Sequence, residues 1–291
     1  MKLEYIVNKL TKYANVKQVL KEEFEISDRL IIKLKKTKQI YLNNKPTFIN
    51  QKLEIGNIIS VDLNFEESSD NIVATKMSLN ILYEDNALLI INKPPFVPVH
   101  PSMDHYEDSL SNGIKYYFNS IGLKRKIRPV NRLDKNTSGI VIFAKNEYVQ
   151  ECLVKQMKSN TFEKEYIALV DGIIDKTKQI VDAPIARKDS SIIERCIAPN
   201  GDTAITEIEL IKTYDEYSLI KCKLKTGRTH QIRVHTNYIS HPILGDDLYG
   251  NKSLKINRQA LHAYKISFIH PINKKNIKIE AKIPKDIESL I

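Results

Sequence analysis

An aspartate in a polar loop ahead of an apolar run is the first candidate for chemistry. Asp134 lies in the segment Arg128–Gly139, and Ile140–Ala144 follows with the composition of a buried strand. A carboxylate at the mouth of such a strand can be both rigid and partly desolvated, which are properties that catalysis uses. The alternative is that Asp134 only caps a turn through the local backbone, as aspartates often do.

A second run, Leu224–His235, offers cations to such a carboxylate. Gly227 permits a sharp turn out of a strand, Arg228 lies in that turn, and Arg233 lies in the helix expected beyond it. An arginine beside Asp134 would hold the carboxylate ionised and oriented by a charge-assisted hydrogen bond.

The histidines and cysteines do not have the spacing of a metal site. His230 and His235 are five residues apart, so they point to different faces of a helix, and no H-E-x-x-H arrangement occurs. Cys152, Cys196 and Cys222 are far apart and none is in a C-x-x-C pair. We therefore expect no metal, and the sparse, odd cysteine count is typical of a reducing compartment.

The third run is Lys164–Gly172, which has the alternation of a strand. Period two puts Lys164 and Tyr166 on one face and Glu165 and Ile167 on the other. A tyrosine in a site can stack on a base and still offer its hydroxyl. Tyr166 is alternatively an ordinary core tyrosine whose hydroxyl is satisfied.

Taken together, these runs resemble the RluA-type family of RNA pseudouridine synthases. The resemblance covers residues 80–284 in the family's order. Further runs that carry it are Ile91–Pro95, His100–Pro101, Ala204–Thr206, His241–Asp246, Tyr249–Gly250 and Leu261–Ala263.

The resemblance implies a role for four residues. Asp134 matches the family's essential aspartate, and Arg233 matches the arginine that pairs with it. Tyr166 matches the tyrosine that packs on the target uracil. Arg132 matches a residue thought to enter the RNA stack where the uridine leaves it.

One position departs from the family pattern. The residue that begins the family's aspartate motif is most often histidine, and here it is Asn131. Asparagine keeps a hydrogen-bonding side chain but cannot titrate. The departure puts in doubt a histidine's role there, and the subfamily and substrate, but not Asp134.

The implied reaction needs no cofactor. Uridine becomes pseudouridine when the base detaches from carbon 1′, turns, and reattaches through carbon 5, with no redox change. No G-x-G-x-x-G or Walker loop occurs, so we expect no nucleotide cofactor. Extruding the base costs a few kcal/mol, which Arg132 could offset by filling the gap and Tyr166 by stacking, worth about 1–3 kcal/mol. Whether Asp134 attacks sugar, attacks base or removes a 2′ proton stays open.

The remaining pattern predicts an α+β fold with a mixed, largely antiparallel β-sheet and flanking helices, because strands do not alternate regularly with helices. The resemblance implies that this is the pseudouridine synthase fold, with its cleft across the middle of the sheet. Expected helices are 108–118, 148–158 and 230–239; expected strands are 87–92, 140–144, 165–170, 204–211, 217–224 and 277–281.

Charge and hydropathy indicate the class of partner. The 291 residues carry a net charge of +10, which favours a polyanionic partner, although frequent lysine can also reflect compositional bias. No stretch approaches the roughly 20 apolar residues that span a bilayer, and the start is not that of a secretory signal. We expect a cytoplasmic monomer with no membrane partner.

The first part of the chain predicts a small separate domain over residues 13–67. A helix is expected at 16–24, and Ser27–Asp28 begins a second helix whose Arg29, Lys33 and Lys36 face outward. This order of elements resembles the RNA-binding domain shared with ribosomal small-subunit protein S-four (the αL domain), although the basic face is alternatively a merely solvated one. We expect a polar linker at 68–77 and a catalytic domain at 78–288.

The leading hypothesis is an RNA pseudouridine synthase that acts on large-subunit ribosomal RNA, with transfer RNA as another candidate substrate. A non-catalytic RNA-binding or ribosome-assembly factor is the alternative, and a nuclease or glycosidase would need paired carboxylates or a metal cluster. The expected RNA contacts are Arg132, Lys164, Arg228, Arg29, Lys33 and Lys36.

Overall fold

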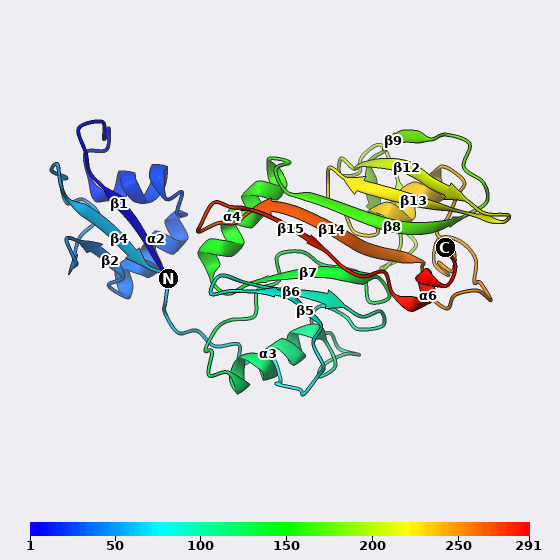
Figure 1. Cartoon of the computed structure of the whole chain (residues 1–291), viewed down its shortest axis with the longest axis horizontal. Coiled ribbons are helices and arrows are strands. Elements are labelled where there is room, and N and C mark those ends of the chain that lie inside the picture. The colour runs from blue at the N-terminus through cyan, green and yellow to red at the C-terminus, as the bar shows by residue number, and fades with distance from the viewer.

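The chain folds around a four-stranded and a nine-stranded β-sheet in a computed structural model that describes residues 1–291. Figure 1 shows the smaller sheet with its helices at one end of the molecule. No helix is both long and apolar enough to span a membrane. The first unit contains β1 (Lys2–Ile6), α1 (Val16–Gln18), the π-helix η1 (Val19–Glu23), α2 (Asp28–Lys36), β2 (Ile40–Leu42), β3 (Lys45–Pro46) and β4 (Ile58–Asp62).

Helix α2 begins where the sequence predicts. The Ser27 hydroxyl accepts a hydrogen bond from the Leu30 backbone N–H, which is a standard way to satisfy a free donor at a helix start. The apolar side chains of the helix, among them Leu30 and Leu34, are buried. The helix expected at 16–24 is instead one α-helical turn followed by the π-helix η1, although Val19 and Leu20 face the core as expected.

The small sheet begins earlier than residue 13. Strand β1 pairs antiparallel with β4, with Leu3 opposite Val61, so residues 2–6 belong to this unit. Leu3 is buried while Lys2 and Glu4 are exposed. This is the period-two pattern of a half-buried strand, and it is too short to stand out from sequence alone.

The segment 68–77 differs from a freely exposed linker. The Ser69 side chain is buried and accepts a hydrogen bond from the Ile127 backbone N–H at 2.9 Å. Asn112 donates from its side chain to the Val73 carbonyl at 2.8 Å. The polar side chains that predicted solvent exposure are here used to bond the segment to the larger domain.

The two units meet where α2 faces α4 (Glu147–Lys158), and Arg29 and Lys33 of the first helix form ion pairs with Glu147 of the second. One apolar cluster includes Leu30 on the first helix and Val149 on the second. Beside it, both terminal nitrogens of Arg128 donate to Glu67 at 2.7 Å, and the Lys33 ammonium binds the same carboxylate. A buried ion cluster next to an apolar contact holds the small unit in one orientation.

The nine-stranded sheet is mixed and largely antiparallel, as predicted; its order is β5-β6-β7-β14-β8-β13-β12-β9, with β15 on β14. The parallel pair is β7 with β14. Its strands are β5 (Ile81–Glu84), β6 (Leu88–Lys93), β7 (Ser138–Ala144), β8 (Glu163–Asp171), β9 (Lys178–Asp182), β12 (Ile205–Thr213), β13 (Tyr217–Leu224), β14 (Leu261–Ile269) and β15 (Asn276–Glu280).

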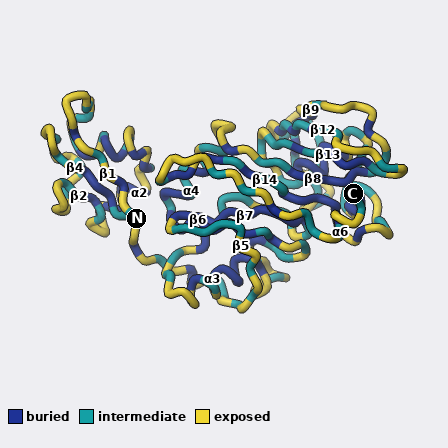
Figure 2. Tube along the Cα trace, in the orientation of Figure 1, coloured by how far each residue is buried: buried dark blue, intermediate teal, exposed yellow.

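Short elements flank this sheet, and Figure 2 shows long buried stretches along its central strands β7 and β8. The predicted helices at 108–118, 148–158 and 230–239 are all present, with shifted ends. They are α3 (Leu110–Ser120), α4 and α5 (Gln231–Tyr238), and the remaining elements are the hairpin β10 (Ile185–Arg187) with β11 (Arg195–Ile197) and the C-terminal α6 (Lys285–Glu288).

The parallel junction of β7 with β14 requires a glycine. Gly139 has a φ of +115°, and a Cβ built there would lie 2.3 Å from the Ala263 carbonyl oxygen. The close backbone approach brings β14 against the start of β7, immediately after the loop that carries Asp134.

Candidate active site

The three runs singled out in the sequence line one cleft of about 960 Å³ on the large sheet. Asp134 enters it from the loop before β7, Lys164 and Tyr166 from β8, and His230 from the turn before α5. The alternation predicted for β8 is confirmed, because Glu165 lies outside this cleft.

Two buried cations hold the backbone of the Asp134 loop. The Lys93 ammonium is fully buried and donates to three carbonyls, including that of Lys135 at 2.9 Å. Arg258 donates to the Asn136 carbonyl at 3.1 Å. Burial lowers the pKa of Lys93 to about 7, so the carbonyls stabilise a charge that burial disfavours. The loop is thereby fixed on both sides of Asp134.

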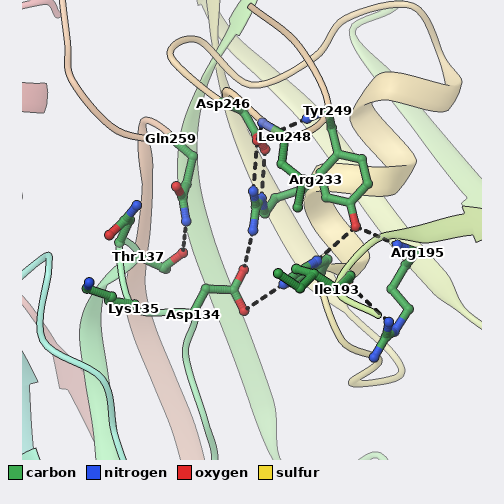
Figure 3. Close-up of polar contacts among 12 residues, drawn as sticks. Asp134, Lys135, Thr137, Ile193, Arg195, Arg233, Asp246, Leu248, Tyr249 and Gln259 are labelled. Carbon is green, nitrogen blue, oxygen red and sulfur yellow. Dashed lines mark hydrogen bonds and ion pairs between the residues drawn. The ribbon is translucent and has the colours of Figure 1, made fainter. Parts of the chain in front are cut away.

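Arg233 joins Asp134 to a second, fully buried carboxylate. It donates to Asp246 from Nε at 2.7 Å and from Nη2 at 2.8 Å, and to Asp134 from Nη1 at 3.0 Å. Figure 3 shows the guanidinium between the two carboxylates. Burial opposes the charge, but the bonds and charge of Asp246, with Asp134, raise the pKa of Arg233. The arginine is therefore a permanent cation whose geometry is set before substrate arrives.

The other oxygen of Asp134 faces a histidine. The distance from His230 Nε2 to Asp134 Oδ1 is 3.8 Å, and His230 Nδ1 lies 2.8 Å from the Tyr249 hydroxyl. That hydroxyl accepts a hydrogen bond from the Arg195 backbone N–H at 2.8 Å. Burial lowers the pKa of His230, although the charge of Asp134 opposes this shift. The imidazole is therefore neutral at physiological pH.

Tyr166 lies against the cleft floor with only 7% of its surface exposed. Burial and then the charge of Asp134 raise the pKa of its hydroxyl, so the side chain is a neutral phenol. Its neighbour Lys164 is half-buried, and burial lowers the pKa of its ammonium. An aromatic ring and a lysine from one face of β8 thus line the same cleft as the carboxylate, which suits a base with its phosphate.

Comparison with known proteins agrees with this arrangement. Residues 87–238, more than half of the chain, match the family described as RNA pseudouridylate synthase. The chain belongs to this family. It is therefore an RNA-modifying isomerase.

Several relatives of this pseudouridine synthase cover most of its length. YjbO of Bacillus subtilis, called an uncharacterized RNA pseudouridine synthase, is 37% identical to this chain. The matched region covers 92% of this chain and 95% of the length of YjbO. The ribosomal large subunit pseudouridine synthase D of Blochmanniella floridana is 35% identical over 87% of this chain and 86% of its own.

A solved structure agrees in fold. Human RNA Pseudouridylate Synthase Domain Containing 1 superposes with a TM-score of 0.59 at 26% identity, and covers 70% of this chain and 83% of its own. The predicted fold, a pseudouridine synthase sheet with a small N-terminal domain, is confirmed.

The residues predicted to contact RNA differ in how freely their charged groups can reach a ligand. Arg132 is exposed at the cleft edge. Arg228 also lines the cleft, but its Nε donates to the Thr203 carbonyl at 2.9 Å. On α2, Lys36 and Arg29 are exposed, Arg29 with a 3.3 Å ion pair to Glu147.

Lys33 does not have the free ammonium expected of an RNA contact. Its side chain is one-third exposed and its charge is paired with Glu67 and, at 3.5 Å, with Glu147. Helical periodicity places Lys33 on the polar face of α2, but only the fold shows that this part of the face meets the catalytic domain. Lys33 thus joins α2 to Glu67 and Glu147, and its contact with RNA stays a prediction.

Asn131, the departure from the family pattern, has a structural partner. Its side-chain amide donates to the Ile140 carbonyl at 3.0 Å and accepts from the Ile142 backbone N–H at 2.9 Å. Both bonds join the segment before Asp134 to strand β7. A non-titrating amide can make this donor and acceptor pair at any pH, so Asn131 positions the loop.

Three site residues were missed as functional groups by sequence reasoning. The sequence places Asp246 and Tyr249 only within runs that carry the family resemblance, and His230 only in a spacing that does not suit a metal. For Asp246 the sequence did contain a signal, because an acid 13 residues from a proposed functional arginine is a candidate ion-pair partner. The contacts of Arg233 with Asp246 and of His230 with Asp134 join residues 13 and 96 positions apart, so only the fold brings them together.

Proposed function

We propose that this synthase converts uridines of large-subunit ribosomal RNA to pseudouridine, with Asp134 as the essential carboxylate. The observation that carries the proposal is the Asp134–Arg233 ion pair at the cleft, beside Tyr166. The Asp134 side chain is 27% exposed, so it is held by the protein and still open to a substrate. Such a preorganised carboxylate is suited to act on a nucleoside that enters the cleft.

The reaction assigns separate tasks to the residues around Asp134. The bond from carbon 1′ to N1 breaks, the bond from carbon 1′ to carbon 5 forms, a proton leaves carbon 5, and N1 ends with a proton. Tyr166 packs on the base while it is detached, and Arg132 fills the space that the extruded uridine leaves. The cleft retains the free base during its rotation.

The choice of ribosomal RNA rests on charge and on relatives. The protein carries a net charge of +10, and its cleft presents Arg132, Lys164 and Arg228 to a polyanion. The named synthase D proteins of Blochmanniella floridana and Neisseria meningitidis act, by their names, on the ribosomal large subunit. Transfer RNA is the other candidate substrate.

The small N-terminal unit, residues 1–67, contributes RNA affinity in this proposal, and residues 78–288 catalyse. Lys36 and Arg29 remain exposed on α2. Lys36→Gln should lower RNA affinity. It should also reduce the slope of log affinity against log salt concentration by about 1, the value expected for the loss of one phosphate contact. Lys188→Gln, which removes an exposed lysine paired with Glu194 outside this unit, is the control. Equal salt slopes for the two variants would contradict a role of α2 in binding RNA.

A pseudouridine map of cellular RNA tests the proposed function. The gene is removed from the source organism, and then either the wild type or Asp134→Asn is restored. We expect specific pseudouridines in large-subunit ribosomal RNA to vanish, return with the wild type, and stay absent with Asp134→Asn. Loss of transfer-RNA sites alone would change the substrate, whereas an unchanged map would favour a binding-only protein.

A further inference from the structure

The tautomer of His230 follows from its two neighbours. The Tyr249 hydroxyl accepts from the Arg195 N–H, and its own proton is available to His230 Nδ1 at 2.8 Å. The assignment that gives the Tyr249 proton a partner makes Nδ1 the acceptor and puts the proton of the neutral imidazole on Nε2. The same tautomer is favoured from the other side, because Nε2 faces a carboxylate oxygen.

This places a fixed donor beside an acceptor at the cleft surface. His230 and Asp134 both line the cleft, and the 3.8 Å from Nε2 to Oδ1 is too long for a hydrogen bond between them. The opposite oxygen of Asp134 is occupied by Arg233 at 3.0 Å. The His230 donor and the free side of Oδ1 are thus available to the same substrate group.

A hydroxyl group matches this pair. An oxygen at about 2.8 Å from both atoms can accept the Nε2 proton and donate its own proton to Oδ1. Among the single groups of a nucleoside, a carbonyl oxygen could use only the donor, and the exocyclic amino group of a base only the acceptor. The nucleoside that reacts at Asp134 carries such a hydroxyl on carbon 2′, next to the carbon at which the bonds are exchanged.

We propose that His230 and Asp134 together bind the 2′-hydroxyl of the target uridine, and that His230 thereby makes the synthase selective for ribose. The inference rests on the proposed function, because it assigns the sugar of that substrate to this pair. Tyr249 is a positioning residue, since its hydroxyl sets the imidazole proton on Nε2.

A synthetic stem-loop RNA that contains a uridine modified by the protein tests the pair. It is made once with ribose and once with 2′-deoxyribose at that single position, and single-turnover rates are compared. We expect the wild type to prefer ribose by about tenfold or more, because the deoxy form leaves the donor without a partner. An equal wild-type rate on both RNAs overturns the inference.

Two substitutions separate the Nε2 donor from the rest of the side chain. An asparagine amide lies near the Nδ1 position and a glutamine amide near Nε2, so His230→Asn loses the donor and His230→Gln keeps it. The backbone at residue 230 has a φ of 58°, which asparagine tolerates well. His230→Asn should slow the ribose substrate about tenfold and leave the deoxyribose rate unchanged; His230→Gln should keep more of the preference.

Tyr249→Phe gives an independent readout. The substitution removes the hydroxyl but keeps an aromatic ring over the Arg233 guanidinium, whose central carbon lies 5.0 Å from the centre of the Tyr249 ring in the wild type. It should reduce the ribose preference in the same direction as His230→Asn. The proposal is overturned if His230→Asn lowers the rates on the ribose and deoxyribose RNAs by the same factor. It is also overturned if Tyr249→Phe leaves the ribose preference unchanged. If the pseudouridine map yields no uridine that the protein modifies, the proposed function is contradicted, and this inference falls with it.

Discussion

Arg233 is held more firmly by Asp246 than by Asp134. The buried Asp246 carboxylate accepts two hydrogen bonds from the guanidinium and also accepts from the Leu248 and Tyr249 backbone N–H groups. Asp134 accepts a single bond from the same guanidinium. The second carboxylate thus fixes the arginine, and the arginine can orient Asp134 without a change of its own position.

Asp246→Asn should therefore damage both stability and catalysis. Removal of the Asp246 charge leaves the buried Arg233 cation with only the partly exposed Asp134 as a counter-ion, which costs about 3–5 kcal/mol of unfolding free energy. The rate should fall more than RNA affinity does, because Arg233 is then free to close on Asp134. Denaturant unfolding and single-turnover rates measure the two effects. Asp247→Asn, an exposed neighbour, is the control, and equal effects of the two substitutions would refute the role of Asp246.

A glycine substitution tests the junction beneath the loop. Gly139→Ala places a Cβ against the Ala263 backbone and should destabilise the fold by more than about 3 kcal/mol. Gly122→Ala is matched, since Gly122 also has a positive φ of +68° but open space around it. That control should cost about 1 kcal/mol for its backbone conformation alone. Similar melting temperatures for the two variants would mean that β14 can move away from β7.

Acid pH should loosen the contact between the two domains through Glu67. Burial opposes ionisation of this carboxyl, but the bonds from Arg128 and Lys33 lower its pKa below the ordinary value of 4.5. A lowered folded-state pKa means that the stabilisation is complete above 4.5 and is lost as pH falls through the folded value.

Glu67→Gln should remove this acid-dependent step and loosen the small domain already at neutral pH. Small-angle scattering against pH measures the separation of the domains. Glu216→Gln, which breaks an exposed pair with Lys255, should leave the profile as in the wild type. A Glu67→Gln profile that matches the wild type would show that apolar contacts alone hold the domains together.

Local patterns predicted much of this molecule. Alternation in Lys164–Ile167 placed Tyr166 in the cleft, and the Ser27 cap marked the start of α2. Strand β14, which lies between β7 and β8, escaped prediction because Lys265 interrupts its apolar run. Such a central strand is recognised by its pairing partners, which are distant in sequence.

The ion pairs also show that the sequence predicts which residues are charged but not which of them meet in the fold. An arginine partner for Asp134 was expected and Arg233 is that partner. Lys33 was expected to face RNA, yet it is paired with Glu67 and Glu147. A charge on a helix face is evident from periodicity, but whether water or another domain covers that face depends on the tertiary structure.

The most direct test of the account is proton release from carbon 5 of uridine. Ribosomal-RNA transcripts with 5-tritiated uridine are incubated with the purified wild type and with Asp134→Asn, and tritium in water is counted. We predict release by the wild type and none above background by Asp134→Asn, with RNA binding and melting temperature nearly unchanged. Release by Asp134→Asn at the wild-type rate would contradict the assignment of Asp134 as the essential carboxylate.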